Sequence, residues 1–433
     1  MGKNIYSELE KNIEEIIQET VQTQRLDLKN FLSKMEETFK KLGFRDEPTA
    51  GGIKNILLVK LDNVGDFILS SAAIREVRKN FPSANITLAV SKSIFPVAER
   101  CPYVNEVLPF DVPADVTNIV TILTSVARFC RDNLWHRRFD FALDFRYFKH
   151  ARYYHIFMSY LSGARERKGY LYNVEDIYTD PDVTKKQDIS RLLYTQLCLH
   201  PKKIVADWQR NLFLLTMFGL KIENTALELW YDEEDKYKAK KLLEGFAPGK
   251  MKIIAGIGAS GPVRKYPIEK FLVAFKKIVE KDAALILLGG SKEIQDAKFL
   301  QENLPEGSVL NLVGKSGGWR VDSAIVSHAD LYIGNDTGLK EIVAVSGVPM
   351  IYISRVAKDR RKNFPNQPTE CEIYVPYRTN YILLQPEHQL GDCAKIPYFG
   401  GCGVFSHSHC IAQVEPEEIV FAFSEMKKSL QEK

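Results

Sequence analysis

Short apolar runs separated by helical stretches recur along most of the chain, and this alternation constrains the fold most strongly. Residues 55–60 predict a strand, and residues 67–80, with apolar side chains at three- and four-residue steps, predict a helix. Further strands are expected over residues 86–90, 106–108 and 139–145. Strands that are apolar on both faces and alternate with helices form parallel sheets covered by helices on both sides. The sequence therefore predicts an α/β fold.

The same alternation restarts near residue 252, which indicates a second sheet. The expected strands cover residues 253–257, 284–288, 309–312, 331–333 and 350–353. We therefore predict two doubly wound, Rossmann-like domains, with ligands bound in the cleft between them beyond the carboxyl ends of the strands. The expected organisation is a helical extension (residues 1–50), an N-terminal domain (51–245), a C-terminal domain (246–415) and a final helix (416–433).

The composition is that of an ordinary globular protein, with 45% hydrophobic and 26% charged residues and a formal net charge of +4. It gives no general nucleic-acid signature. No apolar stretch approaches the roughly 18 residues of a membrane span, and the N-terminus lacks a secretory pattern. We therefore expect a cytoplasmic protein. The amphipathic N-terminal helices (3–43) are interpreted as a helical cap or a dimer element, or alternatively as a membrane-surface or acceptor-docking element.

The first strand ends in a loop that contains Gly65 and Asp66, and a helix follows at once. Gly65 permits a tight turn or the close approach of another backbone. Asp66 stands where a carboxylate caps a helix, which is one interpretation. The other is a catalytic carboxylate, because this position faces the predicted ligand cleft.

The second domain opens with a small-residue turn at residues 256–261, followed by two cations, Arg264 and Lys265. The glycine spacing matches a dinucleotide fingerprint formally, but Pro262 breaks the helix that such a motif requires. A diphosphate site is the better interpretation, with backbone amides and Ser260 holding oxygens while a cation neutralises charge. A solvated basic loop is the alternative.

Two further strands of the second domain run through small-residue turns into helices. One turn contains Gly290 and Glu293, and the other is Asp336–Thr337–Gly338. Each helix start exposes unpaired amides and a positive dipole end. No P-loop is present and no Asp-x-Asp metal-diphosphate motif stands out in a loop, so we expect a nucleotide diphosphate to bind without a catalytic metal.

Four of the seven cysteines crowd into 40 residues near the C-terminus: Cys371, Cys393, Cys402 and Cys410. In a reducing compartment such a cluster favours metal binding over disulfides. Four thiolates could hold a structural iron or zinc ion, with His388, His407 and His409 as rival ligands. Plain buried thiols and disulfides remain alternatives.

Taken together, these loops resemble glycosyltransferase family 9, the ADP-heptose heptosyltransferases that build lipopolysaccharide. The resemblance covers about residues 53–425 and rests on the motifs at 59–66, 258–267, 289–291 and 336–338. It implies the GT-B fold, which consists of two Rossmann-like domains facing across a cleft. The cysteine-rich stretch resembles that of members that glycosylate autotransporter proteins and carry a four-cysteine metal site.

The resemblance also implies roles for individual residues. Asp66 matches the family's catalytic base, and Arg264 stands where the family usually has a diphosphate-binding lysine. The residues implied or interpreted as donor-binding are Gly65, Ser260, Gly261, Arg264, Lys265, Gly290, Glu293, Asp336, Thr337, Gly338 and Glu341. Glu341 departs from the family, which usually has histidine there. A carboxylate beside a diphosphate is repulsive unless a cation such as Lys340 or Arg264 pairs with it.

The resulting expectation is an inverting glycosyltransferase that moves a sugar, expected to be heptose, from an ADP-heptose-like donor to an acceptor hydroxyl. The acceptor is a glycan, a glycolipid or a protein, and no nucleic acid is involved. Residues 145–154 mix cations with aromatics, which fits a half-buried basic helix or a docking surface for the acceptor. Peripheral contact with the inner membrane and homo-oligomerisation are compatible with the sequence. The alternative is a catalytically inactive paralogue that binds sugar nucleotides or serves as a scaffold.

Overall fold

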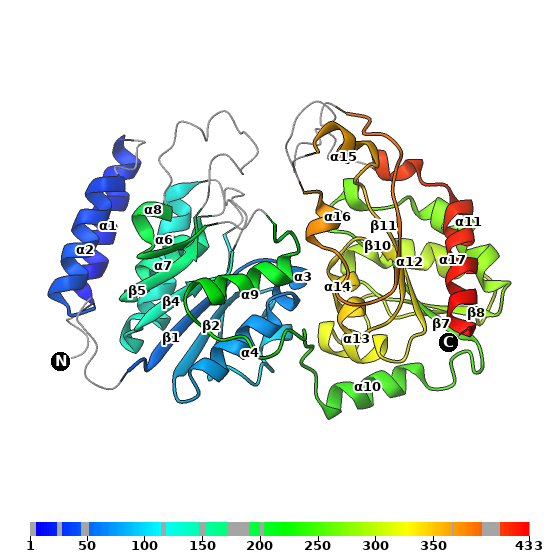
Figure 1. Cartoon of the computed structure of the whole chain (residues 1–433), viewed down its shortest axis with the longest axis horizontal. Helices are drawn as coiled ribbons and strands as arrows, with labels where there is room; N and C mark the ends of the chain where they lie inside the picture. The colour runs from blue at the N-terminus through cyan, green and yellow to red at the C-terminus, as the bar shows by residue number, and fades with distance from the viewer. Residues whose placement is uncertain are drawn as a thin grey trace. The chain divides into compact units, whose positions relative to one another are not determined.

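The computed structural model describes residues 6–23, 28–44, 52–113, 118–146, 153–171, 190–199, 203–365, 368–391 and 408–432. These form two compact units (Figure 1). Unit 1 contains residues up to 63, 70–204 and 208–226, and unit 2 contains residues 64–69, 205–207 and 227 onward. The short segment 64–69, which carries Gly65 and Asp66, therefore packs with the second unit.

Unit 1 is built on a parallel sheet of six described strands in the order β3-β2-β1-β4-β5-β6. Their bounds are β1 Asn55–Lys60, β2 Asn85–Ser91, β3 Glu106–Phe110, β4 Phe141–Asp144, β5 Glu166–Tyr170 and β6 Gln196–Cys198. The central strand β1 is buried from Ile56 to Lys60, as expected for a parallel strand covered on both faces. The register pairs Asn55 with Asn85 and Ile56 with Phe141.

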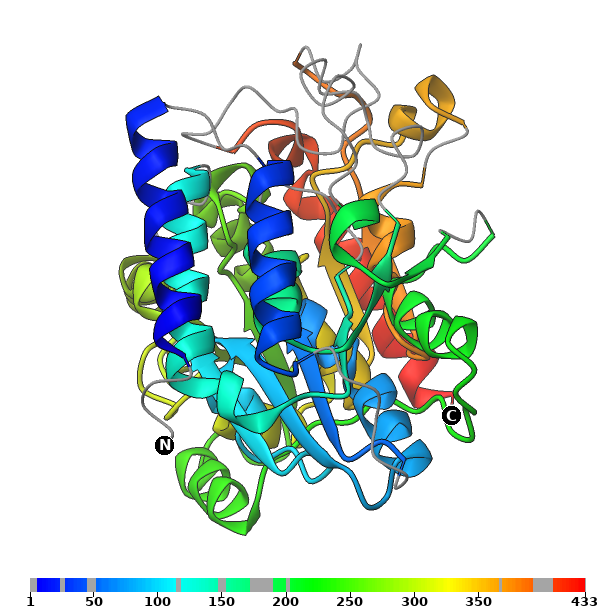
Figure 2. The ribbon, with the colours of Figure 1, turned by 90° about the vertical axis from the view of Figure 1, so that its left-hand side faces the viewer.

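The helices of unit 1 are α1 Ser7–Thr23, α2 Leu28–Lys41, α4 Ser71–Asn80, α5 Phe95–Ala98, α6 Ile119–Asn133, α7 Tyr154–Leu161, α8 Ser190–Leu193 and α9 Asp207–Met217, of which Asp207 belongs to unit 2. The N-terminal helices α1 and α2 lie beside each other (Figure 2). Their apolar side chains, among them Leu9, Phe31 and Phe39, belong to the same buried cluster as α6 and α7. Arg131 of α6 adds an ion pair to Glu10 at 2.8 Å. The N-terminal helices are thus an integral layer of unit 1.

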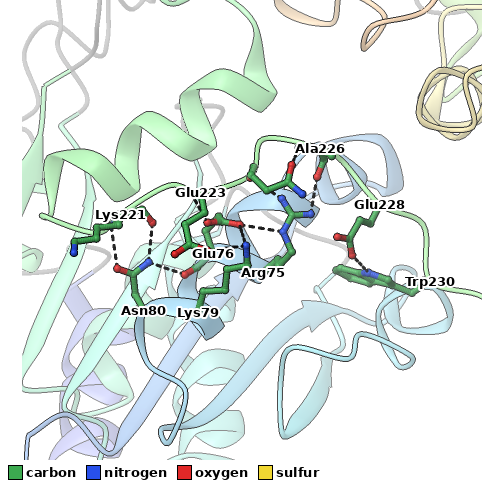
Figure 3. Close-up of polar contacts among 10 residues, drawn as sticks. Arg75, Glu76, Lys79, Asn80, Lys221, Glu223, Ala226, Glu228 and Trp230 are labelled. Atoms are coloured by element: carbon green, nitrogen blue, oxygen red, sulfur yellow. Dashed lines mark hydrogen bonds and ion pairs between the residues drawn. The ribbon is translucent and has the colours of Figure 1, made fainter.

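The segment that follows α9 is held against α4 by polar contacts (Figure 3). Arg75, which is 4% exposed, donates to the carbonyl oxygens of Ala226 at 2.8 Å and Asn224 at 2.6 Å. Glu76 accepts a hydrogen bond from the amide of Glu223 at 2.7 Å. These contacts satisfy backbone groups of an irregular segment that has no strand partner.

Unit 2 repeats the architecture, with six described parallel strands in the order β12-β11-β10-β7-β8-β9. They are β7 Met251–Gly256, β8 Ala283–Leu287, β9 Val309–Asn311, β10 Leu331–Asn335, β11 Met350–Ile353 and β12 Tyr381–Leu384. The helices are α3 Val64–Ile68, α10 Glu233–Leu243, α11 Ile268–Val279, α12 Ile294–Asn303, α13 Trp319–Val326, α14 Gly338–Val345, α15 Asp359–Asn363, α16 Glu370–Ile373 and α17 Pro416–Gln431. The predicted α/β class with two Rossmann-like sheets is confirmed.

The helix expected over residues 67–80 is two helices, because α3 begins at Val64 and ends at Ile68, and α4 begins only at Ser71. Serine side chains compete for backbone hydrogen bonds and disfavour helix interiors, so the pair Ser70 and Ser71 marks the break. Within the described residues, no helix combines the length and hydropathy needed to cross a bilayer.

Candidate functional site

The start of helix α3 packs against the start of helix α14 within unit 2, and two glycines make this approach possible. A Cβ atom on Gly65 would lie 3.2 Å from Cγ of Glu341 and 3.4 Å from Cα of Gly338. A Cβ atom on Gly338 would lie 3.3 Å from the backbone nitrogen of Gly65. The distances of 3.2 Å and 3.3 Å are shorter than ordinary van der Waals contacts. The structure therefore brings the predicted Gly65–Asp66 loop and the Asp336–Gly338 turn together.

Asp66 lies in the first turn of α3 and is partly buried. Its Oδ1 atom accepts a hydrogen bond from the hydroxyl of Tyr374 at 3.1 Å. Burial, and next the negative charge of Asp66, raise the pKa of Tyr374 well above its usual value. The tyrosine therefore remains a hydrogen-bond donor and orients the carboxylate.

Lys340 in α14 is a fully buried cation that holds three groups together. Its Nζ atom lies 2.7 Å from Oδ1 of Asp336, 3.0 Å from Oε1 of Glu341 and 2.6 Å from the carbonyl oxygen of Tyr374. Burial alone would lower the pKa of Lys340, but the two carboxylates outweigh it and raise that pKa. Of the two cations expected to pair with Glu341, the structure selects Lys340.

Glu341 is itself buried, with its side chain 4% exposed. Burial raises the pKa of this carboxyl to about 7; Lys340 opposes the rise, whereas Asp336 and Asp66 add to it. Its second oxygen, Oε2, has no hydrogen-bond partner among the described residues. A carboxyl in this setting exchanges its proton near neutral pH.

Arg264 lies in the short helical turn Pro262–Arg264 and is paired with a carboxylate. Its Nη2 atom donates to Oε1 of Glu370 at 2.7 Å, and Nη2 of Arg355 donates to the same oxygen at 2.7 Å. Burial would raise the pKa of Glu370, but the two arginines hold it below its usual value. Lys265, the second predicted cation, forms an ion pair with Asp296 of α12.

The loops after β7 and β8 are joined by Glu293. Its Oε2 atom accepts a hydrogen bond from the amide of Gly290 at 2.9 Å. A Cβ atom on Gly258 would lie 2.9 Å from Cδ of Glu293, so only glycine fits there without displacing the carboxylate. Ser260 is exposed, and Gly261 directly precedes the Pro262–Arg264 turn.

Asn335, at the end of β10, connects the loop after β7 to the Asp336–Gly338 turn by hydrogen bonds. Its side chain is fully buried, donates to the carbonyl oxygens of Ile257 at 2.9 Å and Gly258 at 3.1 Å, and accepts from the amide of Tyr266 at 3.0 Å. Thr337 is the residue before α14, in extended conformation. The first amides of α14 thus begin at a rigid strand end, an arrangement that suits an anion.

A second polar cluster lies at the ends of β1 and β4 in unit 1. Asp62 forms ion pairs with Lys60, at 3.0 Å, and with Arg146. Burial would raise the pKa of Asp62, but Arg146 and Lys60 outweigh it and hold the pKa well below its usual value. Arg146 is the part of the predicted basic stretch seen in this cluster, whereas residues 147–152 lie outside the described residues.

The predicted metal ligands are only partly within the description, because Cys393 and Cys402 lie outside the described residues. Cys371 is buried, and its Sγ atom lies 3.2 Å from Oγ of Ser354. With Tyr352 and Gln385 it lines a cavity of about 300 Å³. Cys410 is also buried, and its Sγ atom accepts from the amide of Leu390 at 3.3 Å. Two buried thiols are soft donors of the kind a structural metal requires, and the four-cysteine site stays a prediction.

Several residues of the site were not identified from sequence. Tyr374, Glu370 and Arg355 follow no motif, and they reach Asp66 and Arg264 only through tertiary contacts. Asn335 directly precedes the Asp-Thr-Gly turn, and its place at a strand end was the available signal. The site is therefore more extensively paired than its motifs suggested.

Comparison with protein families matches residues 188–363 to glycosyltransferase family 9 (heptosyltransferase). No curated protein sequence matches the chain. Among solved structures, the glycosyltransferase of family 9 from Veillonella parvula is similar with a TM-score of 0.66 and 18% identity, covering 88% of this chain and 98% of that one. The ADP-heptose lipopolysaccharide heptosyltransferase II of E. coli has a TM-score of 0.61 and 15% identity, covering 87% and 99%. E. coli heptosyltransferase WaaC with ADP is similar with a TM-score of 0.57 and 14% identity, and the match covers 86% of this chain and 99% of that one. These likenesses establish a fold shared with GT-B heptosyltransferases.

Proposed function

We propose that this chain is a glycosyltransferase of family 9 that transfers heptose from an ADP-heptose-like donor to an acceptor hydroxyl with inversion. The match of residues 188–363 to the family supports this proposal. The observation that carries the proposal is the contact between α3 and α14. It brings the candidate base, Asp66, next to the helix start that is the candidate diphosphate site. Base and leaving group must lie this close for a single displacement at the anomeric carbon.

In this mechanism Asp66 accepts the proton of the acceptor hydroxyl as that oxygen attacks the anomeric carbon. The carbon–oxygen bond to the diphosphate breaks on the opposite face, and the diphosphate leaves with the electron pair. The amides at the start of α14 and the Arg264 guanidinium stabilise the charge that develops on it. Tyr374 positions Asp66 through its hydrogen bond and takes no proton itself.

Two hydrogen-bonded glutamate side chains help to define the proposed donor site. Glu293 and Glu370 are both largely buried and fix neighbouring groups: Glu293 the Gly290 turn, and Glu370 the guanidinium of Arg264. A guanidinium already held in place loses less side-chain entropy when a phosphate binds. This arrangement supports a preformed site for a diphosphate.

The test is incubation of the purified chain with ADP-heptose and with other nucleotide sugars, followed by mass spectrometry. We expect release of ADP, and addition of one heptose to either a glycolipid fraction or a protein fraction supplied as acceptor. The acceptor fraction that gains the mass distinguishes glycan from protein substrates, including autotransporter proteins. Binding of ADP-heptose without turnover in any fraction would instead identify a sugar-nucleotide-binding paralogue. No binding at all would contradict the donor site.

A further inference from the structure

The buried carboxyl of Glu341 has one oxygen that no described residue uses. An ammonium group has three N–H donors, and those of Lys340 face Asp336, Glu341 Oε1 and the carbonyl of Tyr374. Lys340 therefore has no donor left for Oε2 of Glu341. That atom is buried and has no hydrogen-bond partner within the described part of the chain.

The cluster of Lys340, Asp336, Glu341 and Asp66 contains more negative than positive charge around Glu341. Asp336 lies closer to Lys340 than Glu341 does, 2.7 Å against 3.0 Å, and its side chain is more exposed, 11% against 4%. Asp66 adds a third carboxyl from α3. One ammonium ion neutralises one carboxylate, and burying a second, unneutralised carboxylate costs free energy. Glu341, the less exposed of the pair on Lys340, is the group that best holds a proton.

The buried tyrosines near Glu341 in the described part of the chain supply no further positive charge. Tyr332 of β10 and Tyr352 of β11 are buried, and burial raises the pKa of each hydroxyl, with Asp336 and Glu341 adding to the rise. Tyr374, beyond α16, is neutral for the same reason. These groups therefore leave the proton on Glu341.

The position of Glu341 in the first turn of α14 works in the opposite direction, because a helix start favours a carboxylate. That effect changes an ionisation constant by less than about tenfold, whereas burial can change it by several powers of ten. The balance matches the pKa of about 7. The carboxyl is therefore mostly neutral at slightly acidic pH and mostly ionised at slightly alkaline pH.

We infer that Glu341 contributes to donor binding as a neutral acid, with its Oε2–H group as hydrogen-bond donor to the diphosphate, and that its ionisation expels the ligand. This inference rests on the proposed function, because it assumes a diphosphate at the start of α14. It accounts for a carboxyl where the family usually has histidine. Neutral, the side chain presents a donor; ionised, it repels the phosphate oxygens.

The experiment measures the Kd of ADP-heptose, without acceptor, by calorimetry across the neutral range. A nucleotide sugar is chosen because its diphosphate has no terminal phosphate that titrates in this range, unlike ADP. Since only the protonated fraction binds, the wild-type Kd should rise by about 10- to 30-fold between about pH 6 and about pH 8.5. Glu341→Gln keeps a neutral donor, so its Kd should stay constant within about twofold.

Asp322→Asn is the matched control. Asp322 in α13 is a second buried carboxyl of unit 2, and burial raises its pKa to about 6 against a hydrogen bond from Ser316. This variant should keep the pH dependence of the wild type. A wild-type Kd that does not change with pH, or a Glu341→Gln Kd that still rises, overturns the inference alone. Absence of binding at both pH values by every variant contradicts the proposed donor site, and the inference with it.

Discussion

At the scale of single residues, both cations predicted to bind the donor already face carboxylates, as does Lys340, which was expected to pair with Glu341. Arg264 faces Glu370, Lys265 faces Asp296, and Lys340 faces Asp336 and Glu341. A guanidinium has five N–H donors, so the bond to Glu370 leaves Arg264 able to donate to phosphate oxygens. Glu370 fixes the position of the Arg264 guanidinium. Because Arg355 also donates to Glu370, the single carboxylate does not neutralise both arginines.

Replacing Arg264 by glutamine should weaken binding of a nucleoside diphosphate by roughly 1.5–3 kcal/mol, because one or more charge-assisted hydrogen bonds are lost. The corresponding nucleoside monophosphate should lose less, since it lacks the second phosphate. Calorimetry with ADP and AMP measures both effects.

Arg361→Gln is the control for this substitution, because Arg361 is a half-exposed arginine of unit 2 whose carboxylate partner, Glu372, lies 3.6 Å away. It should leave both affinities unchanged. Equal affinities of wild type and Arg264→Gln for ADP would show that Arg264 does not contact the diphosphate.

At the scale of elements, most strands were predictable, including the edge strands β3 and β9, whereas β5 and the edge strands β6 and β12 were not. Strands such as β1 and β8 are apolar on both faces, so their sequences identify them. The edge strand β6 and its neighbour β5 carry polar residues, and they gave no such signal. The same holds for the site. The turns at strand ends were predictable from local sequence, whereas the roles of Glu370 and Tyr374 depend on tertiary packing and were not.

Helix α4 makes a testable contribution to unit 1 through Arg75. Arg75→Ala removes two hydrogen bonds to the segment after α9 and leaves the fully buried Glu76 without its arginine. A hydrogen bond to a charged group contributes about 1.5–3 kcal/mol, so loss of the two bonds to carbonyl oxygens should lower the free energy of unfolding by roughly 3–5 kcal/mol, although Glu76 keeps its ion pair with Lys79. Denaturant unfolding measures it.

Lys79→Ala, one turn along the same helix, is the comparison. Lys79 pairs with the same Glu76 at 3.4 Å, but its side chain is 37% exposed, so solvent screens the pair. We expect little change in stability. Similar losses in the two variants would mean that helix α4 itself, rather than the contacts of Arg75, is the sensitive feature.

At the scale of the whole molecule, two Rossmann-like units each supply one parallel sheet, and the segment 64–69 belongs by its contacts to the second. Sequence order alone assigns Asp66 to the first domain, because the residue follows the first strand of that sheet. Only the packing of Gly65 on Gly338 and Glu341 shows that the candidate base lies beside the Asp336–Gly338 turn.

The C-terminal cysteines also give a prediction for the whole chain. We expect Cys371, Cys393, Cys402 and Cys410 together to bind about one iron or zinc ion per chain, because four thiolates are strong ligands for either metal. Elemental analysis of protein purified without a metal-binding tag measures the stoichiometry. A metal-free preparation with full stability and transferase activity would favour plain thiols.

The measurement that tests the central claim most directly is the transfer rate of Asp66→Asn beside its affinity for the donor. Asparagine keeps an oxygen that can accept the hydrogen bond from Tyr374, so the variant should fold and bind the nucleotide sugar like the wild type. Without a proton acceptor for the attacking hydroxyl, transfer should fall by roughly 10²–10⁴-fold. A variant that binds donor normally and retains most of its transferase activity would contradict the account, because the base would then lie elsewhere.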